Sequence, residues 1–428
     1  GLFYHSFPLS TLNWYYPICI KIYLSMKSLK NLLREGPGPS SSHTIGPYRI
    51  SKDFLSLLPK ETKSIKVTLY GSLALTGKGH GTDNIIRKAF APLPCEVFFD
   101  YKEINLTHPN TRQCEALDKN NAILLKKRYC SLGGGSYAEE GKKPKESDIY
   151  PFNTFNERKE YRKQNQIEDR YHLIVSFEGR DILSFAIHLL SVSFQTIESS
   201  RQKEDVLPGP LKLKAVAKDI FEQANKSTDP FEKNRRLLSA FAYATSEANA
   251  RGDIVVTAPT CGAAGVVPAV LFHQYRYNHR TIEDLAKAYL IGALVCDFIK
   301  NNASISGAVL GCQAEIGSAC SFAAASLSYL NGLSLFQIEY ASEVAREHFL
   351  GLTCDPVNGY VQIPCIERNA MASIHAFTAY EYAKEISIYR TNKVSFDNVI
   401  LARKETGSEL SPDLKETALG GLAKIIRC

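Results

Sequence analysis

The sequence lacks the features that mark several protein classes. Charged residues make up only 22% of its 428 residues, and 51 basic against 44 acidic side chains leave a net charge of +7. Basic and acidic residues are mixed along the chain, so no stripe of one sign predicts nucleic acid as a partner. The 44% share of hydrophobic residues is that of a globular protein and excludes a chain that stays disordered. At about 150 residues per domain, a chain of this length is expected to form two or three domains with large buried cores.

Cysteine is too sparse for a disulfide framework. Eleven cysteines in a chain of this length do not reach the density of a small secreted domain, and the odd count leaves at least one thiol unpaired. A reducing compartment fits this pattern, so we expect a cytoplasmic protein. The thiols then serve buried packing, metal ligation or catalysis.

The composition of two segments bears on whether the chain carries a signal peptide or a membrane span, and we expect neither. Residues 1–25 carry seven aromatics, two prolines and a single Lys, without a basic start or a clean apolar core, and Met26 resembles a natural start. We therefore interpret residues 1–25 as an upstream extension. The uncharged window 254–272 is long enough to span a membrane, but its prolines, glycines and threonines favour a buried loop that leads into a helix. We expect no membrane partner.

The hydrophobic pattern divides the chain into an α+β half and a helical half. Ile65, Val67 and Leu69 alternate with polar residues as in a half-buried strand, and 95–99 resembles another strand. Glycines punctuate this region, so residues 26–180 are predicted to form a mixed α/β domain. The densely charged stretch 141–170 indicates an exposed excursion or a boundary. From residue 181 onward, apolar residues recur at helical spacing, which predicts a mostly helical domain over 181–428 whose Ala, Gly and Ser residues let helices approach closely.

Three cysteines occupy unusual local sequences. Cys312 lies in GCQAEIG, Cys354 in GLTCDPVNG and Cys365 in QIPCIERNA. Their spacing matches no short zinc signature. Prolines and glycine predict a loop over 354–365, which lets thiols from separate elements converge on one inorganic centre. Thiolates are the usual ligands of iron–sulfur clusters. The alternative from the residues alone is that all three are core cysteines.

Two glycine-rich segments of the N-terminal half carry polar groups suited to substrate binding. GPGPSSSHT presents Ser41, Ser42, His43 and Thr44, whose amides and hydroxyls can form a nest for a carboxylate while the histidine moves a proton. A serine-rich turn that caps a helix is the alternative. YGSLALTGKGHGTD presents Lys78 and His80, and a phosphate loop is a weak alternative because the GxxxxGK[ST] order is absent.

Two further features lie in the helical half. TAPTCGAAG contains Thr260 and Gly262, and its small residues would let the backbone approach a ligand before a helix begins, although a plain helix cap is the competing interpretation. The chain ends in Cys428, whose thiol and free carboxylate resemble a serine or cysteine with an acylated amino group. A frayed terminus is the alternative.

Six segments, in this order along the chain, resemble the iron–sulfur-dependent L-serine dehydratases in their single-chain form. They are GPGPSSSHTIGP, YGSLALTGKGHGTD, TAPTCGAAG, GCQAEIGSAC, GLTCDPVNGYVQIPCIERNAM and KETALGGLA. The resemblance runs from about Met26 to Cys428. It implies an N-terminal β domain related to regulatory amino-acid-binding domains, a C-terminal helical catalytic domain and a homodimer that works in amino-acid degradation and gluconeogenesis.

The resemblance also implies the site. Cys312, Cys354 and Cys365 would ligate a [4Fe-4S] cluster, and Cys428 is a candidate resting fourth ligand or tail inhibitor. Substrate binding would fall to residues of the loops described above, with His43 or His80 for proton transfer; the candidate binding residues are Ser41, Ser42, Thr44, Lys78, Thr260 and Gly262. L-serine would give pyruvate and ammonia. No pyridoxal phosphate is expected, because the serine–phenylalanine–lysine signature for its Schiff base is missing.

Three positions depart from the family pattern. The family usually has Asn where this chain has Cys261, Glu where it has Val309 and Gly where it has Asn358. We expect reduced turnover, and kcat should rise when Cys261→Asn and Val309→Glu restore the usual residues; an unchanged kcat would contradict this. The alternative functions are a related lyase on L-threonine or L-cysteine, a weakly active serine-binding homologue, and a zinc protein.

Overall fold

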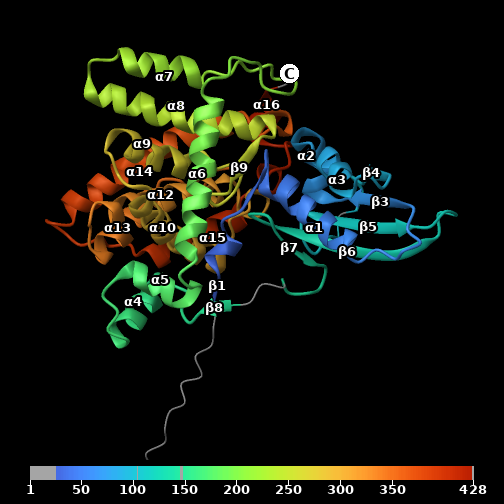
Figure 1. Cartoon of the computed structure of the whole chain (residues 1–428), viewed down its shortest axis with the longest axis horizontal. Helices are drawn as coiled ribbons and strands as arrows, with labels where there is room; N and C mark the ends of the chain where they lie inside the picture. The colour runs from blue at the N-terminus through green and yellow to red at the C-terminus, as the bar shows by residue number, and fades with distance from the viewer. Residues whose placement is uncertain (1–25, 104, 145–147, 427–428) are drawn as a thin grey trace, which may run out of the picture.

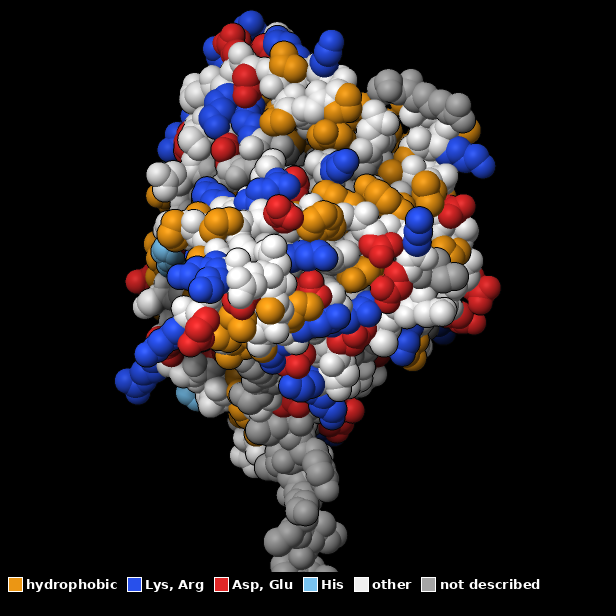
Figure 2. All heavy atoms as spheres, turned by 90° about the vertical axis from the view of Figure 1, so that its right-hand side faces the viewer, with side chains coloured by type: hydrophobic (Ala, Val, Ile, Leu, Met, Phe, Trp, Pro, Cys, Tyr) orange, Lys and Arg blue, Asp and Glu red, His pale blue; other side chains and the backbone are white. Residues whose placement is uncertain are grey.

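The computed structural model describes residues 26–103, 105–144 and 148–426, and it has the predicted α+β architecture. Figure 1 shows a large helical body beside a smaller domain built on a sheet. Residues 1–25, predicted to be an upstream extension, and Cys428 lie outside the described residues. Figure 2 views the molecule from the side of the sheet domain, and basic and acidic side chains are mixed over that face rather than separated by sign.

The smaller domain is a mixed five-stranded sheet in the order β4-β3-β5-β6-β7. β3 pairs with β4 in parallel and with β5 antiparallel, and the other neighbours are antiparallel. Two of these strands confirm the sequence-based predictions, at 65–69 and 95–99. The strands are β3 (Ser64–Leu69), β4 (Cys95–Phe99), β5 (Thr111–Leu117), β6 (Ile123–Gly133) and β7 (Ser136–Glu139).

Three helices complete the core of this domain, namely α1 (Gly46–Leu55), α2 (Gly71–His80) and α3 (Thr82–Phe90). The buried side chains Ile65, Val67 and Leu69 of β3 pack against Phe54 of α1 and Phe90 of α3. The residues between them in β3 are half-exposed, as the alternation predicted. The sheet thus carries α2, which ends at one of the candidate catalytic residues.

The helical body is held together by close approach of helices rich in small residues. A Cβ added at Gly292 of α10 would collide with the Phe322 carbonyl and the Ser326 hydroxyl of α12. This close approach confirms the pattern predicted for the second half of the chain. The helices are α6 (Ile182–Ser200), α7 (Ala217–Lys226), α8 (Pro230–Arg251), α9 (Val266–Tyr277), α10 (Ile282–Asn302), α11 (Gly307–Leu310), α12 (Ile316–Leu330), α13 (Leu335–Glu347), α14 (Cys365–Ile386), α15 (Phe396–Glu409) and α16 (Gly421–Ile425).

Segments from the first 180 residues also join the core of the helical body. Met26, Leu29 and Leu32 are buried in it, together with side chains of α4 (Phe155–Gln164) and α5 (Arg170–Glu178). β1 (Met26–Lys27) pairs with β8 (Asp148–Tyr150), and β2 (Glu35–Pro37) pairs with β9 (Ile254–Val256). The boundary near residue 180 stays a prediction, and it separates segments that share one hydrophobic cluster.

The uncharged window 254–272 forms β9, a buried loop and the first part of α9, as its prolines and glycines predicted. Among the described helices, α6 alone is apolar and long enough to cross a membrane by length and composition, and 44% of that stretch is buried in the protein. Leu190 and Ile197 of α6 belong to the core of the helical body.

Candidate active site

His43 lies in a short π-helix, η2 (Ser41–Ile45), and is fully buried. Ser40 caps this helix with its side chain. The His43 Nε2 lies 3.1 Å from the Ser72 carbonyl oxygen and 2.8 Å from the Thr76 hydroxyl, and Nδ1 lies 2.9 Å from the Ser42 hydroxyl. Because a carbonyl oxygen can only accept, Nε2 carries the proton and Nδ1 keeps its lone pair.

His80 is the last residue of α2 and stacks on His43, with the ring centroids 4.3 Å apart. Its Nδ1 lies 2.7 Å from the Thr76 carbonyl oxygen, which makes Nδ1 the donor. The lone pair therefore sits on Nε2. This buried nitrogen has no hydrogen-bond partner among the residues that the structure describes.

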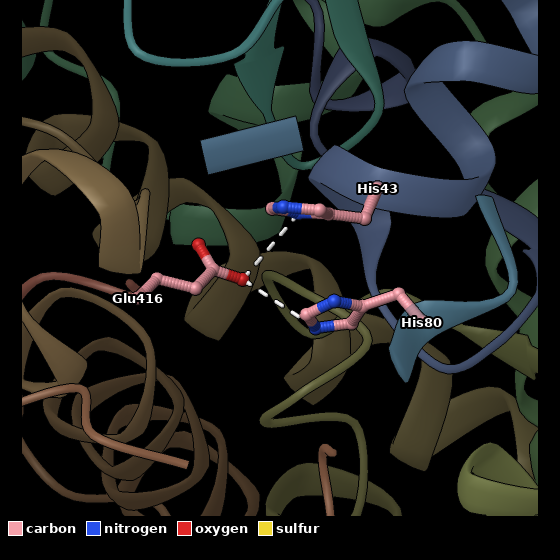
Figure 3. A group of neighbouring side chains, drawn as sticks. All are labelled: His43, His80 and Glu416. Carbon is pink, nitrogen blue, oxygen red and sulfur yellow. Dashed lines mark ion pairs between the residues drawn. The ribbon is translucent and has the colours of Figure 1, made fainter. Parts of the chain in front are cut away.

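Glu416 enters from the C-terminal segment and completes the group drawn in Figure 3. Its Oε1 lies 3.5 Å from the His43 Nδ1 and 3.8 Å from the His80 Nε2. The backbone of Glu416 has φ +59, and it is held on both sides: its N–H donates to the Cys354 carbonyl at 2.7 Å, and its carbonyl accepts from the Ser72 hydroxyl at 3.0 Å. The three ligand atoms lie within 4.8 Å of one another, so they can surround one cation.

Burial sets the protonation states of this group. It lowers the pKa of His43 well below its usual value, with the neighbouring His80 acting in the same direction. Burial also lowers the pKa of His80 to about 4 and raises the pKa of Glu416 to about 8. Both histidines are therefore neutral near pH 7. A neutral imidazole can accept a proton, which is what a general base must do.

The three predicted cysteines come together beside this group. Cys312 begins the turn η3 (Cys312–Ala314), Cys354 lies in the loop after α13, and Cys365 begins α14. The Cys354 segment forms a parallel bridge with Lys415, the neighbour of Glu416. This bridge holds the Cys354 backbone beside the segment that carries Glu416.

The pKa values of these thiols depend on one another and on a nearby arginine. The Cys354 thiol hydrogen-bonds the Cys312 sulfur, and this bond lowers the pKa of Cys312 to about 6, with Arg368 adding to the effect. The same bond raises the pKa of Cys354, and burial raises that of Cys365. All three sulfurs in turn raise the pKa of the Arg368 guanidinium.

A second carboxyl group, that of Glu315, is enclosed by glycines. A Cβ on Gly307 would lie 2.8 Å from the Glu315 Oε2 and 3.1 Å from the Cys354 Sγ, and one on Gly262 would lie 3.3 Å from the Glu315 Oε1. Burial raises the pKa of Glu315 well above its usual range, and the Glu416 carboxyl acts in the same direction. The two carboxyl groups therefore face a common site.

Comparison with known proteins identifies the family. The family described as serine dehydratase beta chain matches residues 28–91, and the serine dehydratase alpha chain matches residues 180–423. An L-serine dehydratase of Haemophilus influenzae is 35% identical, with 94% of this chain and 100% of the relative covered. One of Streptomyces coelicolor is 36% identical over 94% of this chain and 99% of the relative. The chain belongs to the L-serine dehydratase family. It joins in one chain the regions described as beta and alpha chains.

The structure brings most of the predicted site residues of this family member together. Ser42 contacts His43, while Thr44 uses its hydroxyl inside the turn, donating to the carbonyls of Pro37 and Ser40. Ser41 is buried in the same turn. The roles assigned to these residues stay predictions.

Three other candidate substrate residues lie at different distances from the histidines. Thr260 and Gly262 flank Glu315, and Thr260 lowers the pKa of this carboxyl against the effect of burial. Lys78 is exposed, with its ammonium 5.4 Å from the centre of the Phe99 ring. It is outside the buried group, although Lys78 and His80 line the same open pocket of about 390 Å³.

The motifs that carry the family resemblance also contain three site residues that the sequence pattern did not predict. Glu416 lies in KETALGGLA, Glu315 in GCQAEIG and Arg368 in QIPCIERNA. The signal in the sequence that could have indicated these residues was that each lies within one of the quoted motifs. Nothing in the local sequence indicated that these three side chains would meet.

The three departures from the family pattern have different surroundings. Asn358 has φ +52, a conformation that Asn adopts more readily than most residues, so it can replace Gly here. Cys261 is buried in a small cluster with Ile45, Val255 and Ala264. Val309 is half-buried in α11.

Proposed function

We propose that this member of the family is an L-serine ammonia-lyase that converts L-serine to pyruvate and ammonia. The observation that carries the proposal is the meeting of three cysteines with two neutral, buried histidines and two carboxyl groups. The regions matched as beta and alpha chains both contribute, since His43 and His80 come from the first and Cys312 from the second. The names of the relatives support serine as the substrate.

The cysteines suit the [4Fe-4S] cluster that we propose as the cofactor. Three thiols converge around one guanidinium, and Gly307 leaves open the space beside Cys354 that a Cβ would fill. Soft thiolate donors of this kind select iron–sulfur clusters. Cys312, Cys354 and Cys365 would hold the cluster, and when bound it would supply an iron without a cysteine ligand as a Lewis acid.

A single zinc ion fits these cysteines less well. Four-coordinate zinc holds sulfur at about 2.3 Å, which places ligand atoms within about 4 Å of one another. Within the described part of the chain, the group whose ligand atoms are close enough to surround one metal ion is His43, His80 and Glu416, not the three cysteines. The sequence spacing of the three cysteines also matches no short zinc signature.

The protein's own groups provide the proton chemistry. His43 and His80 each direct an unprotonated nitrogen toward Glu416, so one of them can remove the α-proton of serine. Loss of this proton and of the hydroxyl group gives aminoacrylate and water. Aminoacrylate tautomerises to the imine, and water hydrolyses the imine to pyruvate and ammonia. Burial of the site keeps both histidines neutral and ready to accept the proton.

The test is pyruvate release from L-serine by anaerobically purified protein reconstituted with iron and sulfide. D-serine, L-threonine and L-cysteine are run beside it. We expect turnover of L-serine that disappears in air and in Cys354→Ser. Preferred turnover of L-threonine or L-cysteine would assign another substrate, and a colourless protein whose metal survives air would assign zinc. A cluster-loaded protein without turnover would contradict the proposal.

We also propose the wider setting that the family resemblance implies. The protein would be a cytoplasmic homodimer that uses no pyridoxal phosphate. Its α6 would then serve as a core helix rather than a membrane span.

A further inference from the structure

The Glu416 carboxyl group and one unprotonated nitrogen from each of His43 and His80 converge between the two domains. The tautomers set by the Ser72 and Thr76 carbonyls turn the unprotonated nitrogens of both histidines toward the Glu416 carboxyl group. The His43 nitrogen also accepts a hydrogen bond from the Ser42 hydroxyl, whereas the His80 nitrogen does not. Within the described part of the chain, no Lys or Arg nitrogen lies within 4.0 Å of that carboxylate. Burial without a nearby cation raises the pKa of Glu416 to about 8, so its carboxyl group holds a proton near pH 7, and a cation bound beside it would favour the ionised carboxylate.

His80 provides the sharper indication of a missing donor. Its Nε2 is buried, 3.8 Å from the Glu416 Oε1, and has no hydrogen-bond partner among the described residues. Buried polar nitrogens are nearly always paired, so an unpaired one directed at a carboxylate marks a place for a ligand group. A ligand group that donates hydrogen bonds and carries positive charge would satisfy both the His80 nitrogen and an ionised Glu416.

We propose that Glu416 binds the α-ammonium group of the substrate and is the residue that selects amino acids over hydroxy acids. The inference rests on the proposed function, because it takes the substrate to be L-serine. An ammonium group has three N–H donors and one positive charge, which match the acceptors and the carboxylate of this group.

This placement agrees with the chemistry of the reaction. The ammonium nitrogen and the α-proton are bonded to the same carbon. An ammonium held at the Glu416 Oε1 therefore brings the α-proton close to the histidine nitrogens, which lie 3.5 and 3.8 Å from this oxygen. The backbone bonds of Glu416 to Cys354 and Ser72 fix the carboxylate between the cysteines and the histidines.

The test compares two ligands that differ at one group. L-glycerate has the configuration of L-serine but a hydroxyl in place of the ammonium. For Glu416→Gln we expect the KM for L-serine to rise about 10- to 100-fold, while the inhibition constant of L-glycerate stays within about twofold. Glu416→Asp keeps the charge on a shorter side chain and should give a smaller rise in KM.

Matched controls separate this effect from damage to the fold. Glu409→Gln removes an exposed carboxylate at the end of α15 and should leave both constants unchanged. Each variant is checked for iron and sulfide content and for its melting temperature. L-serine binding is also measured by equilibrium dialysis, which needs no turnover.

The outcomes are distinct. A KM for L-serine that is unchanged in Glu416→Gln, or a parallel weakening of both ligands, would overturn the inference. Zinc that copurifies with the wild type and is lost in Glu416→Gln, with serine binding intact, would assign the group to a metal ion and overturn it too. Wild-type protein that binds L-serine through Glu416 but releases no pyruvate would defeat only the proposed function.

Discussion

Asn358 shows how one side chain meets a backbone requirement. It lies in the turn η4 (Val357–Gly359) at φ +52, where Cβ crowds the backbone of most L-residues. Asn tolerates this region better than branched residues do. The turn also packs against α2, because a Cβ on Gly79 would lie 3.0 Å from the Gly359 carbonyl oxygen. Its conformation therefore supports the helix that ends in His80.

Substitution of Asn358 tests this requirement. Asn358→Gly should leave the free energy of unfolding nearly unchanged, because glycine adopts positive φ without strain. Asn358→Val should lower it by about 1–2 kcal/mol. Urea unfolding followed by circular dichroism measures both, and equal stability of the two variants would contradict the backbone argument.

His80 provides a pH-dependent test. Its pKa is about 4 in the folded protein against 6.5 for a free histidine, so protons bind the unfolded state more tightly. The neutral His80 therefore makes its full contribution to the free energy of unfolding above pH 6.5, and this contribution is lost as the pH falls toward 4. The expected loss at pH 5 is about 2 kcal/mol. His80→Gln should reduce the loss between pH 7 and pH 5 in chemical unfolding, and an unaltered pH profile would count against a neutral buried His80.

At the scale of elements, Glu247 links two helices. It lies in α8, and its carboxylate accepts hydrogen bonds from the backbone N–H groups of Val216 and Ala217 at the start of α7. These groups have no partner inside the helix, so the carboxylate acts as a cap. Burial nevertheless raises the pKa of Glu247 to about 7.

The substitution Glu247→Gln distinguishes the effect of the capping hydrogen bonds on stability from the effect of the buried charge. A raised carboxyl pKa means that the folded state binds the proton more tightly, so the protein is most stable below about pH 4.5 and loses stability as the pH rises through 7. The amide keeps a carbonyl acceptor but cannot ionise. The variant should gain about 2 kcal/mol relative to wild type at pH 8 and little at pH 5. Melting temperatures at the two pH values measure this, and an equal change at both would rule out the charge as the cause.

The elements also show what local pattern can predict. The alternation of Ile65, Val67 and Leu69 predicted β3, and the prolines after Ile254 predicted a loop before α9. Both depend on residues close together in the chain. The π-helix around His43 was not predicted, because its Ser131 contact, in which the hydroxyl donates to the Ser42 carbonyl at 2.7 Å, comes from a distant strand.

At the scale of the whole molecule, the N-terminal segment belongs to two cores. Leu29 is buried in the helical body, and Lys300 of α10 donates to the Asn31 carbonyl at 3.2 Å. Leu73 of α2 is buried in the core of the sheet domain. The chain therefore passes through the helical body before it builds the sheet.

Two leucine substitutions test this division. Leu29→Ala should cost about 2–5 kcal/mol and speed amide hydrogen exchange in α10 with little change in β5. Leu73→Ala should cost a similar amount and act on β5 instead. Mass spectrometry of peptides measures the exchange in both variants. If Leu29→Ala speeds exchange in β5, the assignment of Leu29 to the core of the helical body is wrong.

The sequence by itself determined the α+β composition, the order of the motifs and the cysteines, because these depend on residue type and local spacing. The sequence also marked His43 and His80 as candidate catalytic residues, since a histidine in a glycine-rich segment is typical of a binding or catalytic loop. Only the tertiary structure decided that Glu416 lies between these histidines, more than 330 residues away in the chain. Burial keeps both histidines neutral, and the carbonyl oxygens of Ser72 and Thr76 decide which ring nitrogen carries the proton. Both effects depend on contacts between distant segments, which no local sequence pattern records.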